Sequence, residues 1–157
     1  MRVRPRDPAD GTAVAAFLSA RGARRVARLG ELLDPLEYPA LVAEDAGRLA
    51  GVATYVPGAE GWELLTLHAR EARAGVGTAL VEALERLAAA DGCRRLFAIT
   101  TNDNLDALRF YQRRGFRLSR VRPGAVDESR ERLKPEIPKA GDHGIPLHDE
   151  LELEKRL

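Results

Sequence analysis

The sequence has a single cysteine, Cys93, and contains no run of about 18 apolar residues. One cysteine excludes an internal disulfide and favours a reducing compartment. We expect Cys93 to be a small buried hydrophobic residue beside a strand. The charged start, MRVRPRD, is not followed by an apolar segment, so we expect no signal peptide. Together these absences predict a cytoplasmic protein that does not enter a membrane.

The sequence also lacks an excess of either charge. Lysine and arginine total 25 against 24 aspartate and glutamate residues, and the formal net charge is +1. Proteins that bind nucleic acid or anionic lipid through general electrostatics carry a clear basic excess. We therefore expect no nucleic-acid partner. The length of 157 residues suits one domain, and we expect residues 1–157 to form it.

Histidine and cysteine are not arranged for metal binding. His68, His143 and His148 lack the spacing of zinc ligands, both with Cys93 and with one another. The sequence therefore predicts no metal site. Asp142 and His143 lie in a stretch rich in proline and glycine, where an acceptor could bind, although solvated loop residues are the simpler interpretation.

Hydrophobic periodicity predicts alternating strands and helices, and thus a mixed α/β domain. The residue types predict strands at 2–6, 61–69, 94–101, 116–121 and 147–156, and a hairpin at 41–56. Helices are expected at 11–21, capped by Asp10, at 24–33, from Val76 to a stop at Gly92, and at 105–114. The strand at 94–101 is expected to be buried on both faces. Residues 122–146 are expected to form a long loop with one helical turn near 127–133.

The stretch REARAGVGTALVEALERL, residues 70–87, places Gly75 and Gly77 where an amphipathic helix begins. Glycine costs about 1 kcal/mol relative to alanine in a helix interior, so two glycines here need a reason. The first turn of a helix has unpaired N–H groups and the positive end of the helix dipole. Glycine lets an anion reach that backbone. The stretch indicates a phosphate site, although a tight connection without a ligand explains it equally well.

The spacing narrows the choice of phosphate ligand. A P-loop requires a lysine after the second glycine, and none is present. A dinucleotide fingerprint requires glycine or alanine where Leu80 stands, and an acidic residue at the end of a strand that here ends in Thr100 and Thr101. The remaining possibility is a Gly-x-Gly turn that binds the pyrophosphate of coenzyme A.

A second segment, NLDALRFYQRRGF at 104–116, begins with an asparagine and continues with Ala107, Tyr111 and Gly115. Together with LHAREARAGVGTAL it resembles the GCN5-related N-acetyltransferase superfamily. The earlier segment resembles the acetyl-CoA loop of that family, and the later one resembles its N-x-x-A-x-x-x-Y-x-x-x-G-F helix. The resemblance implies a mixed central sheet of about six to seven strands flanked by helices.

Two positions depart from the family pattern. Ala72 stands where the family usually has glutamine or arginine, and Arg73 follows one place later. Ala69 stands where a proline is common. Neither change removes the backbone cradle, because amide groups bind the pyrophosphate. Arg73 could still reach a phosphate, and a solvated surface charge is an equal alternative.

The resemblance implies acetyl-CoA as co-substrate and assigns binding roles by position. Leu67 and its strand neighbours would pair with the pantetheine arm, and His68 would lie at the cofactor turn. Asn104 and Ala107 would contact the cofactor from the next helix, with a plain helix cap as the alternative for Asn104. The pyrophosphate would be held by the loop and helix start, namely Arg73, Ala74, Gly75, Val76, Gly77 and Thr78.

The implied reaction is direct attack of an amine on the thioester in a ternary complex. Tyr111 would donate a proton to the departing thiolate; the alternative is a core tyrosine. Some relatives carry a glutamate base at a place that is apolar here, around Ile99. Glu63 is therefore the better candidate base, with a solvent-facing strand glutamate as the alternative. A backbone N–H in residues 65–68 would stabilise the oxyanion.

Three functions remain open at this point. The first is an acetyltransferase acting on a primary amine, either a small molecule or a protein amine. The second is a noncatalytic acyl-CoA-binding or regulatory module, and the third is transfer of a different acyl group. In this family the regions 24–40 and 122–146 would form the acceptor site. Many small relatives dimerise, so a homodimer is also an expectation.

Overall fold

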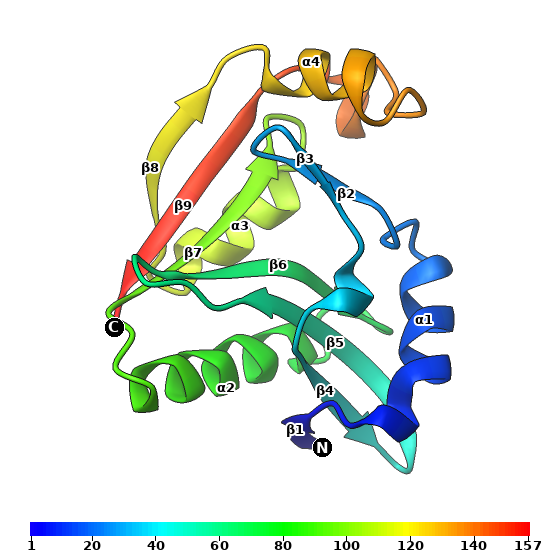
Figure 1. The fold of residues 1–157 in the computed structure, drawn as a ribbon, viewed down its shortest axis with the longest axis vertical. Helices are drawn as coiled ribbons and strands as arrows, with labels where there is room; N and C mark the ends of the chain where they lie inside the picture. The colour runs from blue at the N-terminus through cyan, green and yellow to red at the C-terminus, as the bar shows by residue number, and fades with distance from the viewer. The chain divides into compact units, whose positions relative to one another are not determined.

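The computed structural model describes residues 1–157. The chain has an α/β fold with a mixed seven-stranded sheet and a separate two-stranded sheet, β2–β3. This confirms the expected fold class (Figure 1). The elements are β1 (Arg2–Pro5), α1 (Gly11–Ser19), β2 (Val26–Arg28), β3 (Glu31–Leu33), β4 (Ala40–Asp45), β5 (Arg48–Val56), β6 (Trp62–Ala69), α2 (Val76–Ala90), β7 (Arg95–Thr101), α3 (Leu105–Arg113), β8 (Arg117–Arg122), α4 (Ala125–Arg132) and β9 (Glu150–Arg156).

The chain folds into two compact units. The first unit contains residues 1–25, 34–96 and 157, and the second contains residues 26–33 and 97–156. In the first unit, β1, β4, β5 and β6 lie side by side in that order and pair antiparallel. In the second unit the order is β7, β9, β8.

Helices α1 and α2 pack on opposite faces of the strands in the first unit (Figure 1). Val14 of α1 shares a buried cluster with Val52 of β5. The next position, Gly51, faces α2, since a Cβ built on it would lie 2.5 Å from Cγ1 of Val76. Successive residues of a strand point to opposite faces. Gly51 therefore lets the start of α2 approach β5 closely.

Helix α2 forms where the periodicity predicts it. Its buried side chains recur at helical spacing and are Val76, Leu80, Val81, Leu84 and Ala88. Full burial of each larger apolar side chain contributes roughly 1.5–3 kcal/mol, so this face fixes the helix on the sheet. Gly92 has a φ of +83° and ends the helix region as expected.

The predicted helix at 24–33 is wrong, because these residues form the β2–β3 hairpin. Val26 pairs with Leu33, and the strands are joined at Leu29 (φ 51°) and Gly30 (φ +74°). Two successive left-handed residues make the turn that matches the twist of a hairpin. Leucine rarely adopts this conformation, so the sequence gives only a weak turn signal here.

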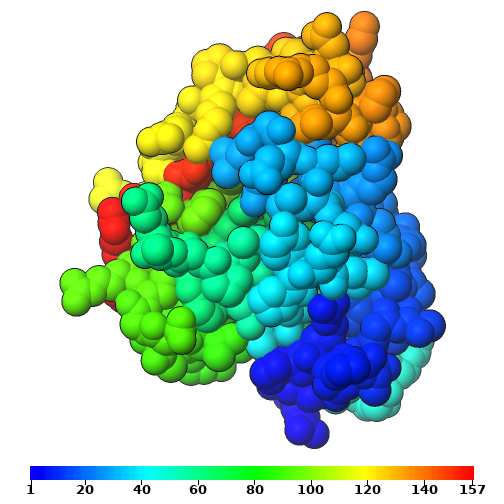
Figure 2. All heavy atoms as spheres, viewed as in Figure 1, coloured from blue at the N-terminus to red at the C-terminus, as the bar shows by residue number.

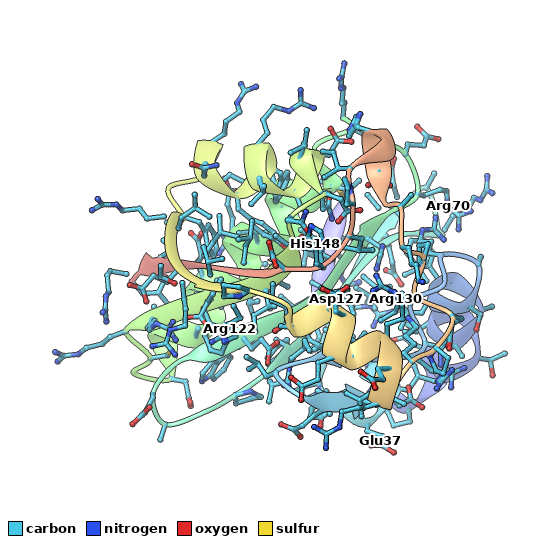
Figure 3. The ribbon with its side chains drawn as sticks, turned by 90° about the horizontal axis from the view of Figure 1, so that it is seen from above. Glu37, Arg70, Arg122, Asp127, Arg130 and His148 are labelled. Carbon is cyan, nitrogen blue, oxygen red and sulfur yellow. The ribbon has the colours of Figure 1, made fainter.

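The region 122–146 contains more helix than predicted. Helix α4 has eight residues and starts at Gly124, which has a φ of +74°. The loop after it is held by Arg130, which donates hydrogen bonds to the carbonyls of Ile137 (2.9 Å), Pro138 (2.9 Å) and Leu147 (2.7 Å) (Figure 3). Its guanidinium thus satisfies three carbonyls that have no strand or helix partner.

Asp10 does not cap α1 with its side chain. Its carboxylate accepts hydrogen bonds from the Arg4 guanidinium, at 2.7 and 2.9 Å, and from the N–H of Asp7. The Arg4 partner lowers the pKa of Asp10 to about 2. Asp7 instead caps a short 3-10 turn at Pro8–Asp10. The side-chain cap therefore lies at Asp7, and the prediction that Asp10 caps the helix is wrong.

Two predictions about burial also differ from the structure. Strand β7 alternates between buried and partly exposed residues, so only one of its faces is fully buried. Cys93 is partly exposed rather than buried, and its Sγ donates to the carbonyl of Arg95 at 3.1 Å.

Candidate active site

The N-terminus of α2 has no polar side chain to satisfy its backbone. Gly75 precedes the helix with a φ of +79°, no side chain caps the first turn, and no acidic residue lies in it. A Cβ at Gly75 would meet nothing within 4 Å. The space would admit a side chain, so it is the left-handed backbone conformation that favours glycine here. Gly77, in contrast, lies inside the first helical turn.

The loop that leads into α2 is fully exposed, and two of its residues are left-handed. Arg73 has a φ of 62°, which is uncommon for a residue other than glycine. Left-handed residues that alternate with other conformations turn successive N–H groups into one concavity that suits an anion. The six residues predicted to bind the pyrophosphate, 73–78, form the end of this loop and the first turn of α2. Thr78 among them also interacts elsewhere in the chain.

Two arginines that the sequence analysis did not select add positive charge to the first unit. Arg70 opens the loop, and its Nε donates to the carbonyl of Leu49 at 2.9 Å. The Arg21 guanidinium lies 3.6 Å from the centre of the Phe17 ring, and that of Arg70 lies 5.8 Å from it. Burial, together with the charge of Arg70, lowers the pKa of Arg21. An anion bound here would offset this repulsion.

One face of β6 carries the polar candidates. On the strand next to it, Val52 faces the α1 core. Paired residues on neighbouring strands point to the same face. The β6 residues that pair with Val52, and with every second β5 residue after it, therefore point toward α1. These pairs are Val52 with His68, Thr54 with Thr66, and Val56 with Glu63.

The groups on this face differ in their surroundings. Glu63 is 3% exposed and interacts with other groups in the protein. The hydroxyls of Thr54 and Thr66 share a hydrogen bond of 2.5 Å. His68 is partly exposed, and its pKa is lowered by burial and by the nearby charge of Arg21. The imidazole is therefore held in its neutral form.

A β-bulge interrupts β6 in the region predicted to stabilise the oxyanion. Thr54 pairs with Thr66 and Tyr55 pairs with Leu64, so Leu65 has no partner residue on β5. An extra residue of this kind leaves the ladder and redirects its backbone groups. Leu67 lies beyond the bulge, opposite Ala53, and is partly exposed.

The α3 candidates lie in the second unit. The Asn104 side chain caps the helix, since its Oδ1 accepts from the N–H of Ala107 at 3.1 Å. Tyr111 is 8% exposed, and its ring packs against Phe110 and Phe116. Its hydroxyl forms no hydrogen bond within the chain, and burial raises its pKa. The hydroxyl is therefore available to a bound substrate.

Two features that would suggest other activities are not found. No group of three or more histidine, cysteine, aspartate or glutamate side chains is placed to hold a metal ion. None of the helices combines the length and the apolar character that crossing a membrane requires.

Known proteins are similar to this chain over most of its length. Residues 12–116 match the family described as Acetyltransferase (GNAT) family. The chain is 41% identical over 118 residues to YdhI of Bacillus subtilis (strain 168), covering 75% of this chain and 72% of that protein.

Solved structures share the fold at lower identity. A ribosomal-protein-alanine N-acetyltransferase from Brucella melitensis matches with a TM-score of 0.71 and 23% identity over 100% of both chains. YncA from Salmonella typhimurium, solved with its cofactor acetyl-CoA, matches with a TM-score of 0.70 and 19% identity over 100% of this chain and 94% of that one. The sequence match over residues 12–116 and the relative at 41% identity establish that the chain belongs to the acetyltransferase (GNAT) family.

Proposed function

We propose that this protein transfers an acetyl group from acetyl-CoA to a primary amine. The observation that carries the proposal is the open N-terminus of α2, whose first turn has no acidic residue and no side-chain cap. A diphosphate fits this end by charge and by hydrogen bonding. The likeness to a protein solved with acetyl-CoA supports the choice of ligand.

The proposed cofactor site is built from backbone and from nearby cations. The N–H groups of residues 73–78 would bind the pyrophosphate, and the left-handed Gly75 keeps the loop in the required conformation. An anion at a helix N-terminus gains roughly 0.3–2 kcal/mol from the dipole. Arg73 and Arg70 would add charge attraction that decreases with salt. On α3, Asn104 would use its remaining amide group, because its oxygen already caps the helix.

The proposed chemistry requires little covalent help from the protein. Bound acetyl-CoA supplies the acetyl group as a thioester, and the amine attacks the carbonyl directly once both are held in line. Glu63, on the α1 face of β6, would accept the amine proton directly or through water. The N–H of Leu65, at the β-bulge, would donate to the oxyanion.

Tyr111 would complete the reaction as a proton donor. Burial raises the pKa of its phenol, so the hydroxyl stays protonated at neutral pH. A raised pKa favours hydrogen-bond donation to the departing sulfur over full ionisation of the phenol. The hydroxyl has no partner within the chain that would compete for this bond.

The proposal is tested by Tyr111→Phe, with acetyl-CoA and a panel of primary amines, read by thiol release. Loss of a general acid lowers rates by about 10²–10⁴-fold, so kcat should fall at least about a hundredfold. The dissociation constant of acetyl-CoA should stay within about threefold, because the pyrophosphate contacts are unchanged. Tyr55→Phe, which removes a phenol hydroxyl from a ring that stacks on Trp62, is the matched control and should keep the natural kcat.

Two results would count against the proposal in different ways. An unchanged kcat in Tyr111→Phe would remove this residue from the mechanism. Binding of acetyl-CoA without turnover of any amine would instead favour a noncatalytic acyl-CoA-binding module. Faster turnover of propionyl-CoA or succinyl-CoA would replace acetyl by a larger acyl group.

A further inference from the structure

Two guanidinium groups lie against the same aromatic ring on the α1 side of the first unit. The centre of the Phe17 ring is 3.6 Å from the guanidinium carbon of Arg21 and 5.8 Å from that of Arg70. Phe17 is 5% exposed and belongs to the buried cluster that α1 forms with the sheet. Cations are attracted to an aromatic face by its negative potential. The ring therefore holds two positive charges near each other.

Each arginine is also fixed by one hydrogen bond to a backbone carbonyl. Nη1 of Arg21 donates to the carbonyl of Phe17 at 3.0 Å, and Nε of Arg70 donates to that of Leu49 at 2.9 Å. Figure 3 shows Arg70 beside α1. Leu49 packs against the α1 cluster, and in Figure 2 the aqua residues of the β4–β5 turn lie next to the blue residues of α1. Both guanidinium groups are thus held in place and keep N–H groups without an acceptor in the chain.

No acid balances these two charges. Neither Arg21 nor Arg70 forms an ion pair with an aspartate or glutamate. Arg4 of the same unit, in contrast, donates to Asp10 at 2.7 Å and to Glu44 at 2.6 Å. Burial and the charge of Arg70 lower the pKa of Arg21, which agrees with repulsion between the two guanidinium groups. Like charges held this close favour binding of an anion.

A neutral imidazole adds one more donor to this group of side chains. The N–H of Arg70 donates to the carbonyl of Ala50 at 2.7 Å, so Arg70 continues the extended chain of β6. Because alternate residues of a strand share a face, Arg70 and His68 point to the same α1 side. Burial and the charge of Arg21 lower the pKa of His68. A neutral imidazole keeps one N–H, which suits an anion.

The charges and donors indicate a phosphate group rather than a carboxylate. The two guanidinium groups carry two positive charges, and a phosphate monoester carries about −1.5 to −2 at neutral pH. Guanidinium groups also match phosphate oxygens through paired N–H donors. A carboxylate brings a single negative charge, so it would balance only one of the two arginines.

We propose that Arg21, Arg70 and His68 bind the phosphate group of a small phosphorylated ligand. The Nη atoms of both arginines and the imidazole N–H donate to its oxygens. This site lies on the α1 side of the sheet, whereas the proposed pyrophosphate site is at the start of α2, which packs on the opposite face (Figure 1). Its occupancy requires neither an amine nor turnover, so it does not rest on the proposed function.

The test is calorimetric titration of the full-length protein with inorganic phosphate at neutral pH, with ionic strength held constant by sodium chloride. We expect saturable binding in the millimolar range. Acetate should bind about tenfold more weakly, because it lacks the second negative charge. The histidine NMR signals report the location. Those of His68 should shift with phosphate, while those of His143 and His148 should not.

Substitutions assign the binding to the two arginines. Arg21→Gln and Arg70→Gln should each weaken phosphate binding about tenfold, since each removes a charged donor. Arg94→Gln is the matched control, because Arg94 is exposed and forms no ion pair, and it should leave the affinity within about twofold. Millimolar phosphate should raise the unfolding temperature of the natural protein and of Arg94→Gln. It should not raise that of Arg21→Gln, whose own unfolding temperature without phosphate shows that it is folded.

Competition identifies the source of the phosphate group. If the site takes the 3′-phosphate of the cofactor, acetyl-CoA displaces inorganic phosphate and 3′-dephospho-acetyl-CoA does not. If it takes a separate molecule, phosphate binds equally well in the presence of either compound. Both results support the site. Displacement by both compounds would assign the bound phosphate to the start of α2 and overturn the proposal.

Three further outcomes would overturn the proposal. These are no saturable binding of phosphate at millimolar concentration, equal affinity for acetate, and unchanged phosphate affinity in Arg21→Gln. Acetyl transfer to amines is measured separately and could still occur in each case, so failure here is distinguishable from failure of the proposed function.

Discussion

Helices α2 and α4 begin in the same way and differ in what satisfies their first turn. Both follow a left-handed glycine, Gly75 with a φ of +79° and Gly124 with a φ of +74°. In α4, the N–H of Gly124 donates to Asp149 at 2.8 Å, and the N–H of Val126 donates to the carbonyl of His148 at 2.9 Å. The first turn of α4 also carries two acidic residues, whereas that of α2 carries none.

The difference shows that a glycine before a helix does not by itself create an anion site. The left-handed conformation sets how the chain enters the helix, and it is equally available to both helices. The neighbouring groups decide whether N–H donors remain for a ligand. In α4 the protein supplies the acceptors itself. The first turn of the 15-residue helix α2 has no acidic residue and no side-chain cap, and we propose that its donors bind the pyrophosphate of acetyl-CoA.

The largest effect is expected from giving α2 the acidic start that α4 already has. Ala74 is exposed, and Ala74→Asp places a carboxylate beside the proposed pyrophosphate. Like charges about 6 Å apart repel by about 3 kcal/mol at an effective dielectric constant of about 20. The dissociation constant of acetyl-CoA should rise on the order of a hundredfold, measured by calorimetry.

The matched control for this change is Ala89→Asp, an exposed position at the opposite end of α2. It adds the same charge far from the loop and should leave the affinity for acetyl-CoA within about twofold. Equal loss of affinity in both variants would mean that net charge, rather than the helix start, governs binding.

A smaller effect should separate the two glycines. Left-handed backbone costs a residue other than glycine about 1–2 kcal/mol, so Gly75→Ala and Gly124→Ala should each lower the free energy of unfolding by that amount. Only Gly75→Ala should also weaken acetyl-CoA binding, by roughly five- to tenfold, as the loop relaxes away from the cradle. Denaturant unfolding and calorimetry on both variants give the comparison. The same loss of affinity in Gly124→Ala would contradict the claim that only the start of α2 binds acetyl-CoA.

The parts of the fold that depend on local pattern could be predicted from sequence. The amphipathic period and the stop at Gly92 correctly predicted α2. The residues from Asn104 to Gly115 correctly predicted α3. The hairpin at residues 26–33 could not be predicted, because its turn uses a left-handed leucine at position 29 that tertiary packing must support.

The candidate site shows the same division. The backbone anion site around Gly75 could be predicted because its glycines lie close together in one short segment of the sequence. Arg21 could not, because it reaches His68 and Arg70 only after α1 packs on the sheet.

The most direct test of the central claim compares acetyl-CoA with S-acetylpantetheine, which carries the same thioester arm without the pyrophosphate. If the start of α2 binds the pyrophosphate, acetyl-CoA should bind at least about a hundredfold more tightly to the natural protein. In Ala74→Asp that advantage should nearly vanish, while the affinity for S-acetylpantetheine stays unchanged. Equal affinities of the natural protein for the two compounds, or an advantage that survives in Ala74→Asp, would contradict the claim.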